Sequence, residues 1–293
     1  YEAGKWIDWV DEVMGKNGVQ QNYNLSVTGG TEKTKIFASL NYNNEEGLIK
    51  NDDRKRYSMR LNLDQSIFSW AKVGFNTNLT YTDSNSRNQG VFVNALTFLP
   101  LGDVYDAEGN INYEYCKDGG KVNPMADEAK NQYVNNTRST YFAGNAYLEL
   151  TPLKGLSFKS VLGTTLNNAR NGVFYGKKSI ANITSGYQAP LAEIYNSSSY
   201  AYRWENVLTY NFTLAKDHNF GITGITSWSK KQDEANESHA QGQELASQSF
   251  HNLGAGTEKV VVRSSFSQTQ SMSYAFRFNY NYQGKYLFTF SNR

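Results

Sequence analysis

Apolar and polar residues alternate along much of this chain, most clearly between residues 20 and 83. Tyr23, Leu25 and Val27, for example, are separated by single polar residues, and Phe37 is the one break in this stretch. A period of two places successive side chains on opposite faces of a β-strand. Each strand predicted here therefore has one apolar face and one face that is too polar to pack inside a dry core.

The same alternation predicts ten strands in the whole chain. They cover residues 20–29, 33–43, 54–65, 70–83, 138–151, 155–168, 199–215, 218–231, 264–282 and 284–293. Most of them exceed ten residues, whereas strands in soluble proteins are typically about 5 or 6 residues long. A tilted strand that crosses a membrane needs about 9 to 11 residues, and a barrel lumen supplies water to its polar face. The pattern therefore predicts an all-β fold, the incomplete wall of a transmembrane antiparallel β-barrel.

The connections between the predicted strands alternate between short and long. The short ones are residues 30–32, 66–69, 152–154, 216–217 and 283, and the long ones are residues 44–53, 84–137, 169–198 and 232–263. Outer-membrane barrels have short periplasmic turns and longer extracellular loops. We therefore expect the four long connections to be extracellular, and residues 30–32 and 283 to lie at the same end of the wall.

Residues 1–19 have a different pattern. Trp6, Trp9 and Val13 follow the spacing of a short amphipathic helix. We expect this segment to be the end of an extracellular loop, with its helix packed on the barrel rim, and residues 20–293 to be the barrel wall and its loops. Because no signal peptide begins the chain and its last residues lie in a predicted strand, we expect an internal piece of a longer protein.

The composition agrees with a barrel. The chain has 21 Tyr, 16 Phe and 5 Trp against 4 Pro, and aromatic side chains suit both pleated surfaces and membrane interfaces. They gather near both ends of the predicted strands, where barrels have aromatic girdles. The mean hydropathy is -0.63. This low average does not argue against a membrane, because half of each barrel strand is polar.

The sequence predicts no catalytic, cofactor or metal site. A net charge of +2 gives no basis for a nucleic-acid partner. The single cysteine, Cys116, excludes an intramolecular disulfide and any zinc site built on cysteine pairs. The three histidines lie far apart, and neither a G-x-S-x-G elbow nor a phosphate-binding loop is present. The acidic stretch GDVYDAEGN lacks the spacing of an EF-hand, and a glycine-containing turn explains it without calcium.

Several stretches of the sequence also resemble a known family. They are QNYNLSVTGGTEKTKIFASLNY, EEGLIKN, RKRYSMRLNLD, WAKVGFNTNLTY, NPMADEAK, LKGLSFKSVLGTTLNN, ENVLTYNFTLAKDHNFGITG and YAFRFNYNYQGKYLFTFSNR. Together they resemble the SusC/RagA-like TonB-dependent transporters of the Bacteroidota outer membrane, and the resemblance covers nearly the whole chain. It implies that the chain forms strands two to eleven of a barrel with about 22 strands.

The resemblance also implies a function. In that family the complete protein imports nutrients across the outer membrane, usually glycans or oligosaccharides and sometimes peptides. TonB supplies the energy through parts that these residues do not include, a plug fills the barrel, and a SusD-like surface lipoprotein covers its mouth. The implied location is the outer membrane of a Gram-negative bacterium of the Bacteroidota, in contact with outer-membrane lipid. The alternatives are a passive or surface-binding outer-membrane barrel without TonB coupling and, more weakly, an outer-membrane hydrolase.

Charged residues on the polar faces of the predicted strands are candidates for the lumen of the barrel. They are Arg56, Arg60, Asp64, Arg203, Glu205 and Arg277. A wet wall with internal ion pairs needs such residues whatever passes through it. We therefore expect wall lining first, contact with a plug second and contact with substrate third.

The 84–137 connection contains an apolar run, VFVNALTFLPLGDVY, which either packs on the rim or folds over the lumen. Its aromatic residues are candidates for contact with a ligand or a lid. They are Phe92, Phe98, Tyr105, Tyr113, Tyr115 and Tyr133. Exposed aromatic loops suit stacking on sugar rings and docking of a protein, because both use amphipathic side chains. We favour the lid, since the family that the chain resembles has one.

Overall fold

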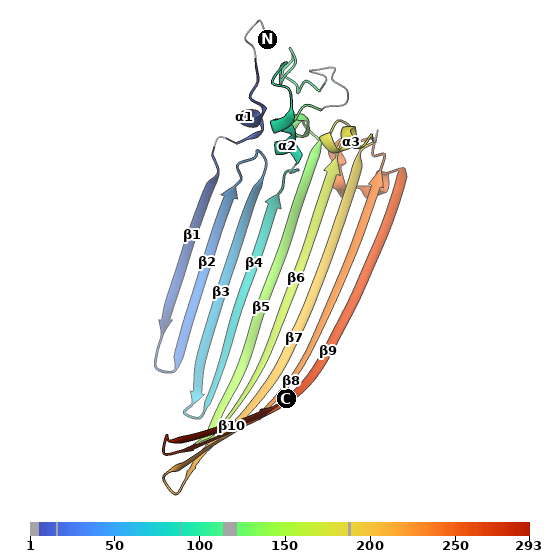
Figure 1. The fold of residues 1–293 in the computed structure, drawn as a ribbon. Coiled ribbons are helices and arrows are strands. Elements are labelled where there is room, and N and C mark those ends of the chain that lie inside the picture. Colours follow the sequence, from blue (N-terminus) through green and yellow to red (C-terminus); the bar gives the residue numbers. More distant parts are fainter. Residues whose placement is uncertain (1–5, 16, 89, 114–121, 187–188) are drawn as a thin grey trace.

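One antiparallel sheet makes up most of the computed structural model, which describes residues 6–15, 17–88, 90–113, 122–186 and 189–293. Its strands are β1 (Val19–Gly30), β2 (Thr34–Glu46), β3 (Asp53–Phe68), β4 (Ala71–Asn85), β5 (Tyr133–Leu153), β6 (Leu156–Tyr175), β7 (Leu191–Leu214), β8 (His218–Gln241), β9 (Glu258–Tyr282) and β10 (Tyr286–Asn292). The ten strands lie in the sheet in sequence order, and each pairs with the next (Figure 1). The predicted fold class is confirmed.

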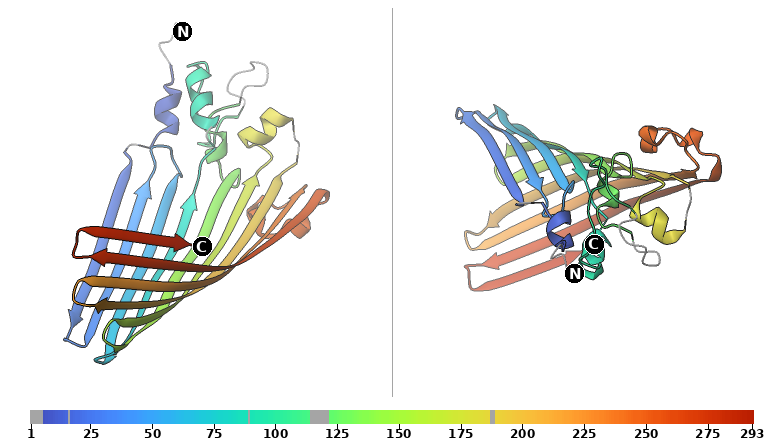
Figure 2. Two further views of the ribbon diagram at one scale, coloured as in Figure 1. Left: turned by 60° about the horizontal axis from the view of Figure 1, so that its bottom comes forward. Right: turned by 90° about the horizontal axis from the view of Figure 1, so that it is seen from above.

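The sheet is long, tilted and curled (Figures 1 and 2). Within the described residues it does not close, because β1 and β10 each have a single neighbour. The tight connections lie together at one end and the helices at the other (Figure 1). The prediction that the first and last tight connections share one end is therefore confirmed.

At the end opposite the tight turns, the strands extend further than the alternation predicted. The strand expected at 199–215 begins at Leu191, and the strand expected at 218–231 ends at Gln241. The connections between strands are correspondingly shorter than predicted and span residues 86–132, 176–190 and 242–257. The added part of β8, QDEANESHAQ, is polar on both faces. Backbone pairing continues there, but no alternation marks it.

The two faces of the sheet differ sharply in chemistry. One row of cross-strand partners on what we call the apolar face is Leu25, Leu40, Met59, Leu79 and Phe142. The neighbouring row on the polar face is Ser26, Ser39, Arg60, Asn78 and Ala143. Strand alternation also places seven further large apolar residues on the apolar face, which are Leu61, Leu63, Phe75, Tyr210, Phe212, Phe276 and Phe278.

Aromatic rings mark both ends of the apolar face. Towards the helices, Tyr23, Tyr42, Tyr57 and Tyr81 lie side by side on β1 to β4, with ring centres 6.2, 5.0 and 6.3 Å apart. We call these four residues the tyrosine row. Near the tight turns a second series joins Tyr210, Phe212, Phe220, Tyr280 and Phe278. This arrangement is typical of the interface girdles of membrane barrels.

The connections opposite the tight turns contain the short helices. These are α1 (Trp9–Val13), α2 (Gly90–Thr97), α3 (Ile180–Ser185) and the 3-10 turns η1 (Ala126–Glu128), η2 (Ala246–His251) and η3 (Leu253–Ala255). Among the described residues, no helix is both long and apolar enough to cross a bilayer. Asp8 caps α1 by accepting from the backbone N–H groups of Val10 and Asp11.

Two apolar clusters hold these connections together. The larger one, which we call the loop core, joins α1, α2, η1 and α3 through Trp9, Val13, Val91, Ala95, Phe98, Val104, Val122, Met125, Ala126 and Ile180. The smaller one joins Phe250 of η2 to Phe174 and Ala192 on β6 and β7. The Phe250 ring lies directly over Gly172. A larger residue does not fit there, because its Cβ would lie 2.5 Å from the ring.

Candidate functional site

A hollow of about 830 Å³ lies on the polar face across β3 to β9. Its side chains are mainly amides, hydroxyls and cations, and include Arg60, Asn62, Asn76, Asn78, Asn145, Arg203 and Lys231. Asn76 Nδ2 donates to Asn145 Oδ1 at 3.1 Å, and Lys231 pairs with Asp233 at 2.8 Å. No carboxylate is among the described lining residues. Such a surface offers many hydrogen bonds to a polar solute and no catalytic group.

A second polar cluster lies nearer the tight turns on the same face. Tyr147 Oη donates to Asp64 Oδ1 at 2.7 Å. Lys159 Nζ lies 4.5 Å from the centre of the Tyr147 ring and 3.6 Å from Glu149 Oε2. The ring crosses Gly74, where a Cβ would meet it at 2.1 Å. Asp64 is thus held by its neighbours in the wall.

The strand register puts all six predicted lumen candidates on the polar face, but it does not bring them together. Arg60 and Arg203 line the hollow, whereas Asp64 belongs to the Tyr147 cluster. The other three share the face without lining the hollow, and are Arg56, Glu205 and Arg277. The asparagines of the hollow were not among the predicted site residues. Their alternation within β3, β4 and β5 carried the signal, but only the register shows that they are neighbours.

The predicted loop candidates have different environments. Phe98 is buried in the loop core, where it packs edge-on against Trp9 with ring centres 5.2 Å apart. Tyr113 is half-buried and lies 4.6 Å from Lys178 Nζ, and Tyr133, the first residue of β5, lies against the Arg87 guanidinium at 5.1 Å. Tyr105 is exposed. Of the two candidates in the apolar run named here, Phe98 is thus part of the loop core and Tyr105 is not.

Two other loop candidates complete this picture. Phe92 is half-buried on α2. Tyr115 lies outside the described residues.

Exposed apolar side chains nonetheless remain at this end of the wall. Val93 and Leu96 project from the same side of α2 and are 58% and 60% exposed. Leu101 follows α2, and Trp6 is held nearby because Ile7 N donates to Pro100 O at 3.2 Å. We call Trp6, Val93, Leu96 and Leu101 the loop patch. An exposed group of this kind is typical of a surface that binds a partner.

Buried charges anchor the base of the loop core. Arg87 pairs with Glu128 and donates to the Asp127 carbonyl, and Asp127 Oδ1 accepts the Ile180 N–H at 2.8 Å. Asp127 Oδ2 has no partner among the described residues. Burial raises the pKa of Asp127 from 3.8 to about 6, although the Ile180 N–H and the Arg87 charge oppose the shift. Burial also raises the pKa of Tyr113.

Other described polar groups have structural partners. His218 lies on the apolar face, with Nδ1 2.8 Å from the Tyr280 hydroxyl. Asp106 Oδ1 accepts the backbone N–H groups of Glu108 and Asn110, which closes the turn expected in GDVYDAEGN. In the described part of the chain, no three potential metal ligands gather.

The chain is similar to TonB-dependent receptors over nearly its full length. No family model matches it. It is 28% identical to TonB-dependent receptor P26 of Formosa agariphila over 98% of this chain and 29% of that protein. It is 27% identical to TonB-dependent receptor SusC of Bacteroides thetaiotaomicron over 34% of this chain and 10% of that protein. The chain thus spans about 29% of the length of the first curated relative.

Solved structures give the same fold. The structure of the RagAB peptide transporter matches 98% of this chain and 33% of that chain with a TM-score of 0.79 and 20% identity. The fold is therefore that of the wall of a transmembrane β-barrel. The chain is thus similar in sequence to TonB-dependent receptors, SusC among them, and similar in fold to the RagAB transporter.

Proposed function

We propose that this chain is part of the barrel of a TonB-dependent outer-membrane importer of nutrients. The observation that carries the proposal is the match over 98% of the chain to TonB-dependent receptor P26. A sheet with one apolar and one polar face supports it, because lipid requires the former and a wet lumen the latter. The predicted lumen residues line this lumen, and the loop end faces outward from the cell.

The proposed substrates are glycans or oligosaccharides, with peptides as the second candidate. The polar hollow supports this choice, because its amides, hydroxyls and guanidinium groups can bind hydroxyl groups or peptide groups equally well. RagAB is described as a peptide transporter. That description supports peptides as candidates without deciding between the two classes.

Growth experiments test the import proposal directly. A strain that lacks the gene of the full-length protein should lose growth on one glycan or peptide of a panel, and a tonB strain should lose growth on the same nutrient. Restoring the gene should restore growth. Growth that depends on the gene but survives loss of TonB would instead support the passive barrel.

We further propose that the loop end binds a SusD-like surface lipoprotein as a lid. The loop patch supports this, because four exposed apolar residues lie at the end that faces outward in our orientation. Deletion of part of 84–137 or 232–263 in the full-length protein should weaken co-purification of the lipoprotein from native membranes in mild detergent. The double substitution Val93→Asp with Leu96→Asp should do so without shortening a loop.

The control for the patch is Leu153→Asp, at the tight-turn end, where the side chain is also exposed. It should leave co-purification unchanged. Isolation of the wild-type barrel without any lipoprotein would contradict the lid.

A further inference from the structure

The apolar face becomes charged just beyond the tyrosine row, on the side of the helices. On β4 the residue after Tyr81 on that face is Asp83, which is the register partner of Arg138 on β5. Arg138 is in turn the partner of Arg170 on β6. Both arginines therefore lie on the membrane side of the wall, just past an interface girdle. In the proposed orientation this is the depth of the lipid headgroups.

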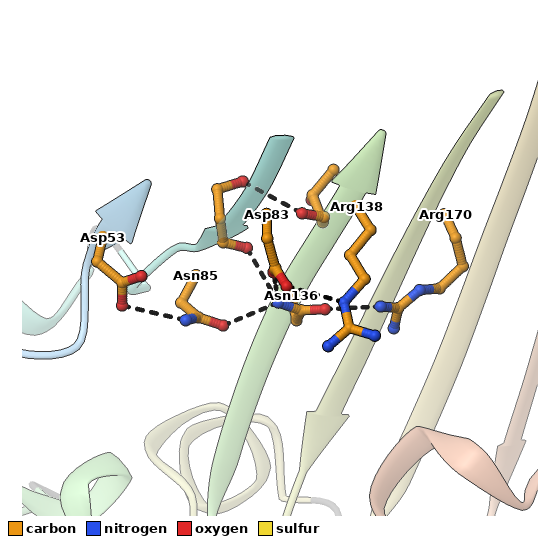
Figure 3. A network of polar contacts seen from close by, with 8 residues as sticks. Asp53, Asp83, Asn85, Asn136, Arg138 and Arg170 are labelled. Carbon is orange, nitrogen blue, oxygen red and sulfur yellow. Dashed lines mark hydrogen bonds and ion pairs between the residues drawn. The ribbon is translucent and has the colours of Figure 1, made fainter. Parts of the chain in front are cut away.

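A chain of hydrogen bonds fixes the positions of these charges (Figure 3). Arg138 Nε donates to Asp83 Oδ2 at 3.0 Å, and Asn136 Nδ2 donates to Asp83 Oδ1 at 2.7 Å. Arg170 Nη2 donates to Asn136 Oδ1 at 2.6 Å. Its guanidinium carbon lies 4.8 Å from the centre of the Phe250 ring. These partners hold both arginines in place, but only Arg138 is paired with a carboxylate.

The network contains two carboxylates and two guanidinium groups, but only one of the carboxylates contacts an arginine. Asp83 forms an ion pair with Arg138, and no described carboxylate pairs with Arg170. Asp53, at the far end of the network, accepts from Asn85 and contacts neither guanidinium (Figure 3). The Arg138 side chain is 55% exposed, and its two terminal nitrogens have no hydrogen-bond partner among the described residues. A guanidinium with two free terminal nitrogens matches the oxygens of a phosphate.

A hollow of about 830 Å³ adjoins the two arginines on this face. Its other side chains include Thr140, Asn168, Asn196, Asn236 and Phe266. Amides and hydroxyls suit the hydroxyl groups of a sugar. Leu166 and Tyr200, one register step further towards the tight turns, begin the apolar surface along which acyl chains can pack.

One acidic residue also lines the hollow. It is Glu234, whose Oε1 accepts from Gln232 at 2.8 Å. It lies on β8, two strands from β6 in the sheet.

We propose that Arg138 and Arg170 bind the phosphate of a phosphorylated glycolipid of the outer leaflet. Arg138 donates to the phosphate, Arg170 supplies a second positive charge, and the sugar lies in the adjoining hollow. A lipid fits better than free phosphate, because the site opens on the membrane side and continues into the apolar face. The proposal rests on the orientation given under the proposed function, but concerns the outside of the barrel.

The test uses the full-length protein, purified in detergent, with lipid A as the probe. Binding is measured by native mass spectrometry and by the rise in melting temperature. Arg138→Gln and Arg170→Gln should each weaken lipid A binding roughly tenfold, since each removes a hydrogen bond or a charge from a charged ligand. Dephosphorylated lipid A should bind the wild-type protein as weakly as lipid A binds the arginine variants. Arg263→Gln, on the polar face of β9, is the matched control and should leave binding unchanged.

Four results would overturn the proposal. They are equal binding of the phosphorylated and dephosphorylated lipids, equal losses in the Arg263 control, tight binding of inorganic phosphate alone, and unchanged binding in both arginine variants. If an arginine variant does not fold, Phe250→Leu should still weaken binding, because it frees the Arg170 guanidinium. Nutrient uptake is measured in the same strains. Lipid binding without any uptake would contradict the import proposal alone.

Discussion

The membrane part of the wall and its loop end differ in where they place their apolar side chains, although the same strands run through both. Of the buried apolar residues in the described part of the chain, only Ala71 lies near the tight turns, and the others belong to the loops or to adjoining strand ends. The membrane part exposes Leu25, Phe75 and Leu208 instead. Its apolar side chains meet lipid, so it needs no core. The loop end meets water on all sides and must therefore build one.

Because of this difference, we expect that each region can be destabilised without the other. Backbone pairing holds the membrane part, and neighbouring strands satisfy each other's N–H and C=O groups. Side-chain packing holds the loop end. A substitution that empties the loop core should leave the sheet intact, and a charge on the apolar face should leave the loop core intact.

The largest expected effect is Trp9→Ala. Trp9 is 2% exposed, packs against Phe98 and donates from Nε1 to the Leu99 carbonyl. Its loss should destabilise the loop core by about 3–5 kcal/mol. Limited proteolysis should then cleave the connection between β4 and β5 while the strands stay protected. Trp6→Ala is the control, since Trp6 is 72% exposed and should cost little.

Phe276→Arg tests the other region. Phe276 lies on the apolar face, and Phe276→Arg should cost about 2–4 kcal/mol if the residue lies near the depth of the bilayer midplane. Its neighbour Ala275 lies on the polar face, so Ala275→Arg should cost much less. A folding titration in lipid vesicles measures both. Equal costs would show that the two faces do not have different surroundings.

The buried carboxyl of Asp127 makes the loop end sensitive to pH. Because burial raises its pKa from 3.8 to about 6, the folded state holds the proton more tightly than the unfolded state. Stability contributed by Asp127 is therefore fully present below pH 3.8 and declines as the pH rises to about 6. Asp127→Asn should remove this decline and stabilise the loop core at pH 7 by about 3 kcal/mol.

Hydrogen exchange in α2 and η1, compared between wild type and variant at each pH, measures the effect. A difference that does not change between pH 4 and pH 7 would contradict the assignment of the titration to Asp127. The strands of the membrane part serve as the internal control, since their exchange should respond to neither change.

The smallest effect is expected at Tyr147. Tyr147→Phe removes the hydrogen bond to Asp64 but keeps the ring over Gly74. It should lower the free energy of unfolding by about 1 kcal/mol. Tyr141→Phe, also on the polar face, removes a hydroxyl without that partner and should cost less. A larger loss from Tyr141→Phe in the same titration would contradict the role given to Asp64.

The sequence predicted the membrane part well and the loop end poorly, for a physical reason. Lipid on one side and water on the other impose a period of two, and this period revealed the face of every candidate from Arg56 to Arg277. Where both faces meet water, as in the last residues of β8, no period survives and the strand ends were placed too early.

The sequence pattern also could not predict contacts between segments that are distant in the chain. Phe98 was a candidate for contact with a ligand or a lid, in a run that could also pack on the rim, and its contact with Trp9 required the structure. Likewise, Arg170 lies in a segment that was expected to be a loop. Its register with Arg138 required the structure.

The strict sequence order of the strands has a consequence for assembly. Each strand pairs only with its neighbours in the chain, so most of the sheet forms by closing short loops, which costs little entropy. The exception is the closure of β4 onto β5 across residues 86–132. We expect that hairpin to form late, after the loop core has drawn its ends together. A wall built this way can grow or shorten by whole hairpins during evolution without altering the strands already in place.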